Sequence, residues 1–197
     1  TVTLLQNACA EKNITMTGDF TVDLNGHSIS SANGQNDLTI SSAKGKQTIR
    51  SNDANGKHNY SFIEAAGGEL TLDTIWVGSV SALSGTLSVN RSTVISLKVS
   101  GGFAEASDSR LEFAVVNGTG DLTLRKTEIT KNSNTSLQVN GGKVSIKDGT
   151  QIPCIVLVTG GEVQIDGGTF SGYEGHWLQQ TGGLVSVNNG NLTGTML

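Results

Sequence analysis

The chain has 197 residues, of which 36% are hydrophobic and 5% aromatic, and its formal net charge is −4. It contains no basic run, which argues against nucleic acid as a partner, because nucleic acid is held mainly through Lys and Arg on its phosphates. The same charge balance disfavours binding to an anionic membrane surface. The longest apolar run, around Cys154–Val158, is far shorter than the ~20 residues of a membrane-spanning helix, so we expect no membrane insertion.

The first third of the chain follows a strand pattern loosely. Residues 1–17 are expected to form a first rung or a cap. Val22–Ile29 has the same spacing of apolar residues as the later segment Val185–Leu192, and Leu38–Ile40 is expected to begin another rung. The polar stretch that follows, residues 50–61, is predicted to be a projecting loop.

From residue 68 onward a glycine returns in a fixed setting, Gly-x-φ-x-φ-x-x-small-x-φ, in which φ is an apolar residue. These glycines are Gly68, Gly85, Gly102, Gly120, Gly142, Gly161 and Gly183, and they are separated by 17, 17, 18, 22, 19 and 22 residues. A period near twenty with alternating apolar residues is typical of a stacked solenoid. We expect each glycine to supply the positive φ that a sharp corner requires.

Each repeat contains three short strand signals: x-φ-x-φ after the glycine, a second around the apolar residue five places further on, and a third before the next glycine. Turns of variable length between them predict an all-β fold, a right-handed parallel β-helix of about nine rungs with three short strands per rung. A left-handed hexapeptide helix would need spacings near multiples of six, which the observed spacings exclude. The expected inward column is Leu24, Ile40, Leu72, Val89, Ala106, Leu124, Ile146, Ile165 and Val187.

One rung departs from this spacing. After Ile146 the second-strand position holds Gln151, and the apolar residue follows at Ile152, so a one-residue insertion is expected there. The chain begins in strand-like sequence and ends directly after a rung. We therefore expect residues 1–197 to be a single elongated domain and a piece of a longer protein.

Stacking also brings charged residues of opposite sign to the same position on neighbouring rungs, ~4.8 Å apart. The columns are Arg91, Asp108, Lys126 and Asp148; Asp121, Lys143 and Glu162; and Arg110 with Glu128. Catalysis by a pair of carboxylates would require two neighbouring acids, or one acid in a dry pocket. We interpret the columns as solvated cross-strand pairs that fix register, and a charged ligand groove is the alternative.

We expect neither a metal nor a cofactor. The three histidines, His27, His58 and His176, show no metal-ligand spacing, and residues 160–166 lack the middle glycine of the calcium-binding nonapeptide. A structural metal held by Asp148 or Asp166 together with backbone oxygens is the alternative. Cys9 and Cys154 are six or seven rungs apart, roughly 30 Å, so free thiols are predicted.

A lateral face of the predicted solenoid carries the candidate site. Counting back from each glycine, the outward third-strand residues are expected to be Phe62 and Glu64, Ser79 and Ser81, Ser96 and Lys98, Ala114 and Val116, Ser136 and Gln138, Ile155 and Leu157, and Trp177 and Gln179. This face is polar in the middle of the stack and becomes apolar towards the C-terminus. Beside it is a late insertion, residues 171–176, with the densest aromatic cluster of the chain.

A sugar ring needs an aromatic face for its C–H groups and polar groups for its hydroxyls. The candidate ligand-binding residues are therefore Tyr173, Glu174, His176, Trp177, Gln179, Ile155 and Leu157. Two alternatives remain: these residues pack under their own loop or against another segment of the intact protein, or a register slip turns Trp177 inward.

The opening segments, Thr1–Gln6, Asn13–Gly18 and Val22–Ile29, resemble the first rungs of secreted right-handed β-helix proteins. Such openings are frequent in large cell-surface and adhesin-like proteins of bacteria and some archaea, and in the pectate-lyase-like superfamily. The Gly-Gly rungs are similar to repeats of autotransporter passengers and adhesins. The resemblance is architectural, and this fold carries many functions.

Two departures from the enzymes of this fold count against catalysis. Polygalacturonase-like enzymes carry an Asp cluster, a His-Gly and an Arg-x-Lys, whereas this chain has no Arg-x-Lys and Ser28 follows His27. Lyase-like enzymes use aspartates for calcium beside an arginine base, whereas the acids here alternate with bases.

The resemblance implies an extracellular module, exposed at a bacterial cell surface or secreted. We expect an adhesin that binds a glycan or a host surface protein through a lateral face, with self-association along that face as a further expectation, and no enzymatic activity. One alternative is a fragment of a polysaccharide-active protein, such as a lyase, a glycosidase or a phage tail spike, with Glu174 and His176 as its acid and base. The other is a structural spacer without a ligand.

Overall fold

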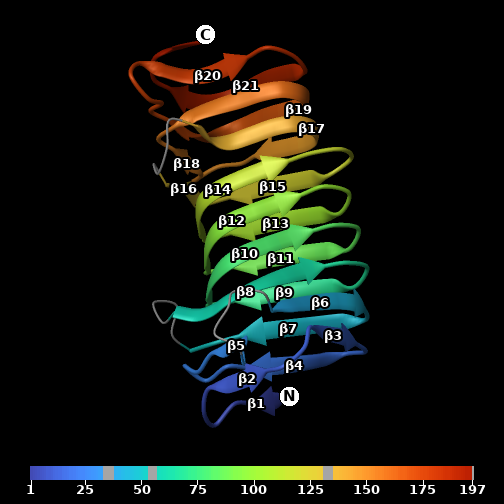
Figure 1. The fold of residues 1–197 in the computed structure, drawn as a ribbon. Coiled ribbons are helices and arrows are strands. Elements are labelled where there is room, and N and C mark those ends of the chain that lie inside the picture. Colours follow the sequence, from blue (N-terminus) through green and yellow to red (C-terminus); the bar gives the residue numbers. More distant parts are fainter. Residues whose placement is uncertain (33–37, 53–56, 131–134, 197) are drawn as a thin grey trace.

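The computed structural model of the chain describes residues 1–32, 38–52, 57–130 and 135–196, with residues 57–61 described by their backbone alone. They form a parallel β-solenoid of about nine turns, which confirms the predicted fold class. The chain rises from the N-terminus to the C-terminus as a right-handed coil (Figure 1). No helix that could cross a membrane occurs in these ranges.

The strands are β1 (Val2–Thr3), β2 (Ala8–Ala10), β3 (Ile14–Thr17), β4 (Phe20–Asp23), β5 (Ile29–Ser31), β6 (Thr39–Lys44), β7 (Lys46–Arg50), β8 (Lys57–Ala65), β9 (Glu69–Asp73), β10 (Trp76–Ala82), β11 (Thr86–Asn90), β12 (Thr93–Val99), β13 (Phe103–Ser107), β14 (Arg110–Val116), β15 (Asp121–Arg125), β16 (Glu128–Ile129), β17 (Thr135–Ile146), β18 (Gln151–Ile152), β19 (Ile155–Phe170), β20 (His176–Gln180), β21 (Leu184–Leu192) and β22 (Thr195–Met196). Each strand pairs in parallel with the equivalent strand of the next rung, as β9, β11, β13 and β15 do in sequence. Register is therefore transmitted from rung to rung.

The second and third predicted strands of the central rungs are joined. β10, β12 and β14 are each one continuous strand of seven residues with the same burial pattern. Alternation breaks once inside each strand, so that Val94, Leu97 and Val99 of β12 all point inward. The break bends the strand around the corner of the solenoid without a separate turn. Three distinct strand segments return in the later rungs, where β15, β16 and β17 follow one another.

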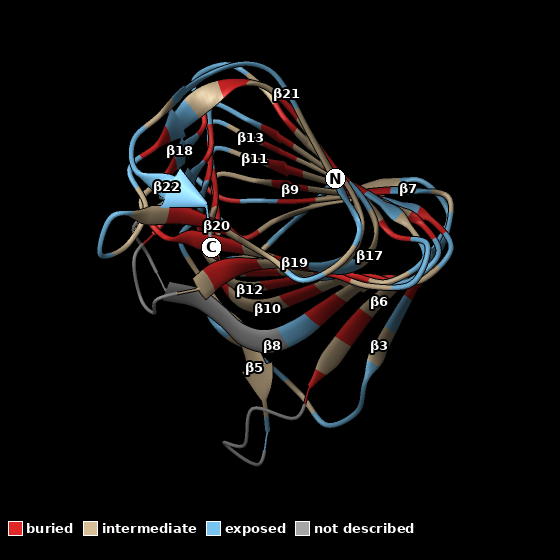
Figure 2. Cartoon of the chain, turned by 90° about the horizontal axis from the view of Figure 1, so that it is seen from above, coloured by how far each residue is buried: buried red, intermediate tan, exposed pale blue. Residues whose placement is uncertain are grey.

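The core is one long stack of aliphatic side chains. Figure 2 colours the buried residues red, and they recur on successive rungs of the coil. The predicted first-strand column is correct from Leu72 to Ile165, because these residues are buried and pair with one another rung by rung. Val187 pairs with Ile165 but is 46% exposed, so its predicted burial is wrong. It is wrong for Leu24 and Ile40: Val22 pairs with Ile49, and Ile49 pairs with Leu72. Ile40 is buried in β6 opposite Ile63 and belongs to the third-strand wall.

The predicted reason for the glycines is wrong in the first four repeats. Gly68, Gly85, Gly102 and Gly120 do not have positive φ. A Cβ on Gly85 would instead lie 2.4 Å from the carbonyl oxygen of Gly68 on the rung below. Close stacking of backbone on backbone therefore excludes a side chain there. Of the seven repeat glycines, Gly142 (φ 68°), Gly161 (φ 77°) and Gly183 (φ 72°) combine this close approach with positive φ.

The first third of the chain begins with a rung, and its predicted loop is partly strand. Residues 1–17 supply β1, β2 and β3, which pair with β4, β5 and β6 as the lowest rung. In the predicted loop 50–61, residues 57–61 already belong to strand β8, and residues 53–56 lie outside the described part of the chain. The predicted one-residue insertion is confirmed, since Ile152 pairs with Phe170 and both side chains are buried.

Candidate functional site

Trp177, the central aromatic residue of the predicted ligand-binding site, is not on the surface. Trp177 is only 3% exposed and lies edge-on to the buried Phe170, with ring centroids 5.5 Å apart and an interplanar angle of 65°. Ile155, in the equivalent position one rung below, is 8% exposed. The expectation that both residues point outward is wrong, because the chain enters the third strand from a corner that turns these side chains onto the core. The inward alternative for Trp177 is the one observed.

The late insertion forms a tight hairpin. Tyr173 and His176 exchange backbone hydrogen bonds of 2.8 and 2.9 Å, and between them Glu174 and Gly175 have φ of 49° and 83°. Two consecutive positive φ values are typical of a type I′ turn. The Glu174 carboxylate accepts a hydrogen bond from the Tyr173 hydroxyl, and this raises the pKa of Tyr173 above its usual value. The predicted acid and base have different partners, because His176 Nδ1 lies 2.9 Å from Thr195 Oγ1.

Two residues of the predicted site do lie on the lateral face. Leu157 of β19 and Gln179 of β20 are paired on adjacent rungs, half-buried and outward. The same face is interrupted at Ala114, Val116 and Ser136, which were expected outward and are fully buried. The structure therefore divides the seven predicted residues among the core, a corner hairpin and a flat strand surface.

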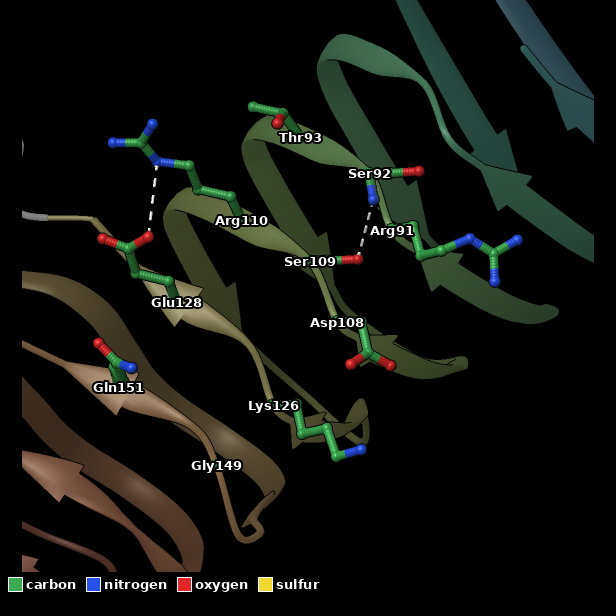
Figure 3. Close-up of a pocket in the computed structure, with 10 residues that line it drawn as sticks. All are labelled: Arg91, Ser92, Thr93, Asp108, Ser109, Arg110, Lys126, Glu128, Gly149 and Gln151. Carbon is green, nitrogen blue, oxygen red and sulfur yellow. Dashed lines mark hydrogen bonds and ion pairs between the residues drawn. The ribbon is translucent and has the colours of Figure 1, made fainter. Parts of the chain in front are cut away.

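A groove lies instead at the corner where the first strand of each central rung ends. Thr74, Arg91, Asp108 and Lys126 occupy this corner on successive rungs, and all four have positive φ between 47° and 56°. The left-handed residue turns the chain at the corner. The next residue points inward, and the residues on either side of it point outward. The result is a trough between two rows of side chains (Figure 3).

One wall of the trough is the left-handed row Arg91, Asp108 and Lys126. The opposite wall is the register-paired row Thr93, Arg110, Glu128 and Gln151, at the starts of β12, β14, β16 and β18. The groove has a volume of about 390 Å³ and follows the solenoid axis over four rungs. At its upper end Gly149 takes the left-handed position, and a Cβ there would lie 2.8 Å from Cγ of Lys126.

The floor of the groove is a ladder of buried hydroxyl groups. Ser109 Oγ donates to the carbonyl of Ser107 at 2.7 Å and accepts from the backbone N–H of Ser92 at 3.2 Å. Ser92 repeats this arrangement one rung below, and Thr127 one rung above donates to the carbonyl of Arg125. These bonds satisfy backbone groups that the left-handed corner removes from the sheet ladder, and they hold the two walls at a fixed separation.

The charged residues of the groove are only partly paired. Arg91 is turned away from Asp108 and binds Asp73 on the rung below, with its Nη2 atom 2.6 and 2.8 Å from the two carboxylate oxygens. Arg110 is 3.9 Å from Glu128, as predicted. Within the described ranges neither Asp108 nor Lys126 forms an ion pair. The predicted alternating column is therefore not a continuous chain of ion pairs.

The outer columns behave differently. Lys143 and Glu162 form the predicted pair at 3.6 Å, whereas Asp121 has no ion pair among the described residues. Asp148 was predicted to follow Lys126 in the charged column, but Gly149 occupies that corner position. The one-residue insertion of this rung shifts the corner by one residue.

An aromatic residue that the sequence analysis missed continues the second wall. Trp76 pairs directly with Thr93 at the start of β10 and is half-buried. Its indole therefore lies one rung below the groove, in line with Thr93, Arg110 and Glu128. The repeat could have indicated this alignment, because Trp76 and Thr93 both directly follow the position written as "small" in the repeat.

Asp166, which was weighed as a metal ligand, is occupied by protein groups. Lys147 binds its carboxylate, Gln164 Nε2 lies 2.9 Å from both oxygens, and Asn188 Nδ2 lies 2.7 Å from one of them. These bonds, with that of Lys147 the strongest, lower the pKa of Asp166 to about 2. No group of three His, Cys, Asp or Glu side chains suited to a metal ion occurs in the described part of the chain.

Both cysteines are free, as predicted. Cys9 is exposed, and Cys154 is fully buried, which raises the pKa of its thiol.

Comparisons of the chain with protein-family models, with curated proteins and with solved structures give no match.

Proposed function

We propose that the chain is a surface-exposed binding module, adhesin-like in its action, that holds a glycan along the corner groove. The observation that carries this proposal is the groove itself, with hydrogen-bond donors and acceptors on two rigid walls and the half-buried Trp76 in line with one of them. Sugar rings bind through hydroxyl groups and an apolar ring face; the groove offers partners for the hydroxyl groups, and Trp76, one rung below it, offers an aromatic face.

The geometry suits an extended ligand parallel to the solenoid axis. Equivalent side chains recur every ~4.8 Å along the axis, so a chain of similar units would meet similar groups at each step. The walls are fixed by strand pairing and by the buried hydroxyl ladder. Pre-ordered walls lower the conformational entropy that binding would otherwise cost.

This proposal moves the site from the late-rung face to the central rungs. Trp177 and Ile155 are in the core, so they offer no surface to a ligand. The cell-surface or secreted location, and a host surface protein as an alternative ligand, remain parts of the same proposal and rest on the resemblance to adhesin-like β-helices.

A glycan array tests the proposal directly. Wild-type domain would be compared with the double variant Arg110→Gln, Lys126→Gln, which removes two donors from the groove. The matched control is Lys98→Gln, Lys143→Gln, which removes two exposed charges of the same sign from other faces. We expect the groove variant to lose at least about tenfold in affinity, since hydrogen bonds to charged groups contribute roughly 1.5–3 kcal/mol each, and the control to bind normally.

Equal binding by both variants would refute the groove as the site. No binding by wild type to any glycan would refute glycan recognition and favour a spacer or a protein ligand. Release of reducing ends from a bound polysaccharide, abolished by Glu174→Gln, would identify the polysaccharide-active alternative.

A further inference from the structure

The charges along the groove form a balanced pattern. Asp108 and Arg110 flank Ser109 on one rung, and Lys126 and Glu128 flank Thr127 on the next (Figure 3). The sign on each wall therefore reverses between these two rungs. Arg110 has Asp108 across the trough and Glu128 one rung away on its own wall. Lys126 has Glu128 across the trough and Asp108 one rung away on its own wall.

The fifth charged residue of the groove adds little to this balance. The guanidinium of Arg91 lies against both carboxylate oxygens of Asp73, and the side chain is directed away from the trough. Its charge is therefore neutralised by the protein. The groove is close to electrically neutral although five of its ten lining residues are charged.

Resting on the proposed function, we propose that this groove selects a neutral glycan over an acidic one. A uronate or sulfate that approaches Arg110 or Lys126 also meets Asp108 or Glu128 about one rung away, and like charges at that separation repel. The formal net charge of −4 adds a long-range repulsion of polyanions.

A neutral sugar can use both signs of charge at once. Its hydroxyl groups donate to Asp108 and Glu128 and accept from Arg110 and Lys126, and such charge-assisted hydrogen bonds are stronger than those between neutral groups. A polyanion could use only the cations and would leave the acids opposed to its own charges. The alternating charges would thus favour a neutral ligand over an acidic one through several groups together and not through one contact.

Matched oligosaccharides of equal length test this inference. The probes are galactan and galacturonan, glucan and glucuronan, and mannan and mannuronan, in which a hydroxymethyl group is exchanged for a carboxylate. Calorimetric titration of wild type should show tighter binding of the neutral member of the pair that is recognised. The double variant Asp108→Asn, Glu128→Gln should raise affinity for the acidic member by about fivefold to tenfold, because two like-charge repulsions are removed.

The control is Asp121→Asn, Glu162→Gln, which makes the same change of net charge at the starts of β15 and the first-strand segment of β19, away from the groove. An unchanged preference in this control, together with the shift in the groove variant, would support the inference. Preference of wild type for a uronan would overturn it and leave glycan binding intact. A neutral preference that the groove variant does not change would also overturn it. Absence of binding to all six probes would refute neutral-glycan selection together with the proposed function for these ligands.

Discussion

The indole of Trp177 meets the ring of Phe170 edge to face inside the last complete corner of the solenoid, with 5.5 Å between the ring centroids. Phe170 has no exposed surface, and Trp177 is 3% exposed. This pair therefore closes the core beneath the hairpin Tyr173–His176. Trp177, which follows the polar insertion, therefore packs in the core.

Trp177→Ala is expected to lower the free energy of unfolding by about 3–5 kcal/mol, because it removes a large buried side chain and leaves a cavity next to Phe170. Urea unfolding followed by circular dichroism measures this change. Affinity for any glycan, measured under conditions where the variant is folded, should match that of wild type. A selective loss of affinity at unchanged stability would show that Trp177 contacts the ligand.

Gly85→Ala is expected to destabilise the solenoid more than Gly175→Ala does. A Cβ on Gly85 would lie 2.4 Å from the carbonyl of Gly68, and relieving this collision in a well-packed stack costs about 1–3 kcal/mol or more. At Gly175 no atom lies within 4 Å of the added Cβ, so only the strain of φ 83° remains, about 1 kcal/mol. Comparing urea midpoints of the two variants tests this. Equal midpoints would mean that backbone stacking tolerates a side chain at the glycine corner.

Ser109→Ala is expected to lower the free energy of unfolding by about 1–3 kcal/mol, because the buried N–H of Ser92 and the carbonyl of Ser107 lose their hydroxyl partner. The control Ser88→Ala removes a half-exposed outward hydroxyl from β11 and should change stability by no more than about 0.5 kcal/mol. Rescue of stability by Ser109→Thr, which restores the hydroxyl, would separate the lost hydrogen bonds from the lost packing. Equal effects of the two alanine variants would show that the ladder is not energetically important.

Stability should depend on Asp166 between pH 4 and pH 2. The pKa of this carboxyl is about 2 in the folded chain against an ordinary value of 3.8, so the unfolded state binds more protons in this window and stability falls as the pH falls. The contribution is complete above pH 4 and is lost as the pH reaches 2. In Asp166→Asn this loss is absent, so the urea midpoints of wild type and variant should converge on acidification. A constant difference from pH 6 to pH 2 would contradict this assignment.

The architecture could be predicted from the sequence because the same pattern recurs in many repeats. The glycine period, the alternation after each glycine and the apolar residue five places later each recur on successive rungs, so a single irregular rung does not obscure the pattern. The insertion at Ile152 was visible for the same reason. Parallel stacking then places Arg110 beside Glu128 without further information.

The outward face could not be predicted equally well because strand alternation has a period of two. The connection from Val116 to Gly120 is one residue longer than the corresponding connection from Val99 to Gly102, so counting back from Gly120 assigned Ala114 and Val116 to the wrong side. The groove was missed for a different reason. Positive φ is uncommon for Arg and Lys, so nothing in the sequence around Arg91 or Lys126 indicated the left-handed corner.

The corner that shapes the groove also separates two kinds of sequence constraint. Within the groove the floor residues Ser92, Ser109 and Thr127 carry hydroxyl groups that bond the backbone, whereas the residues on either side of each point outward. A family of such chains could therefore exchange the wall residues rung by rung while keeping one scaffold. Duplicating a rung would lengthen the groove by one rung, so the length of this surface could be set by the number of repeats.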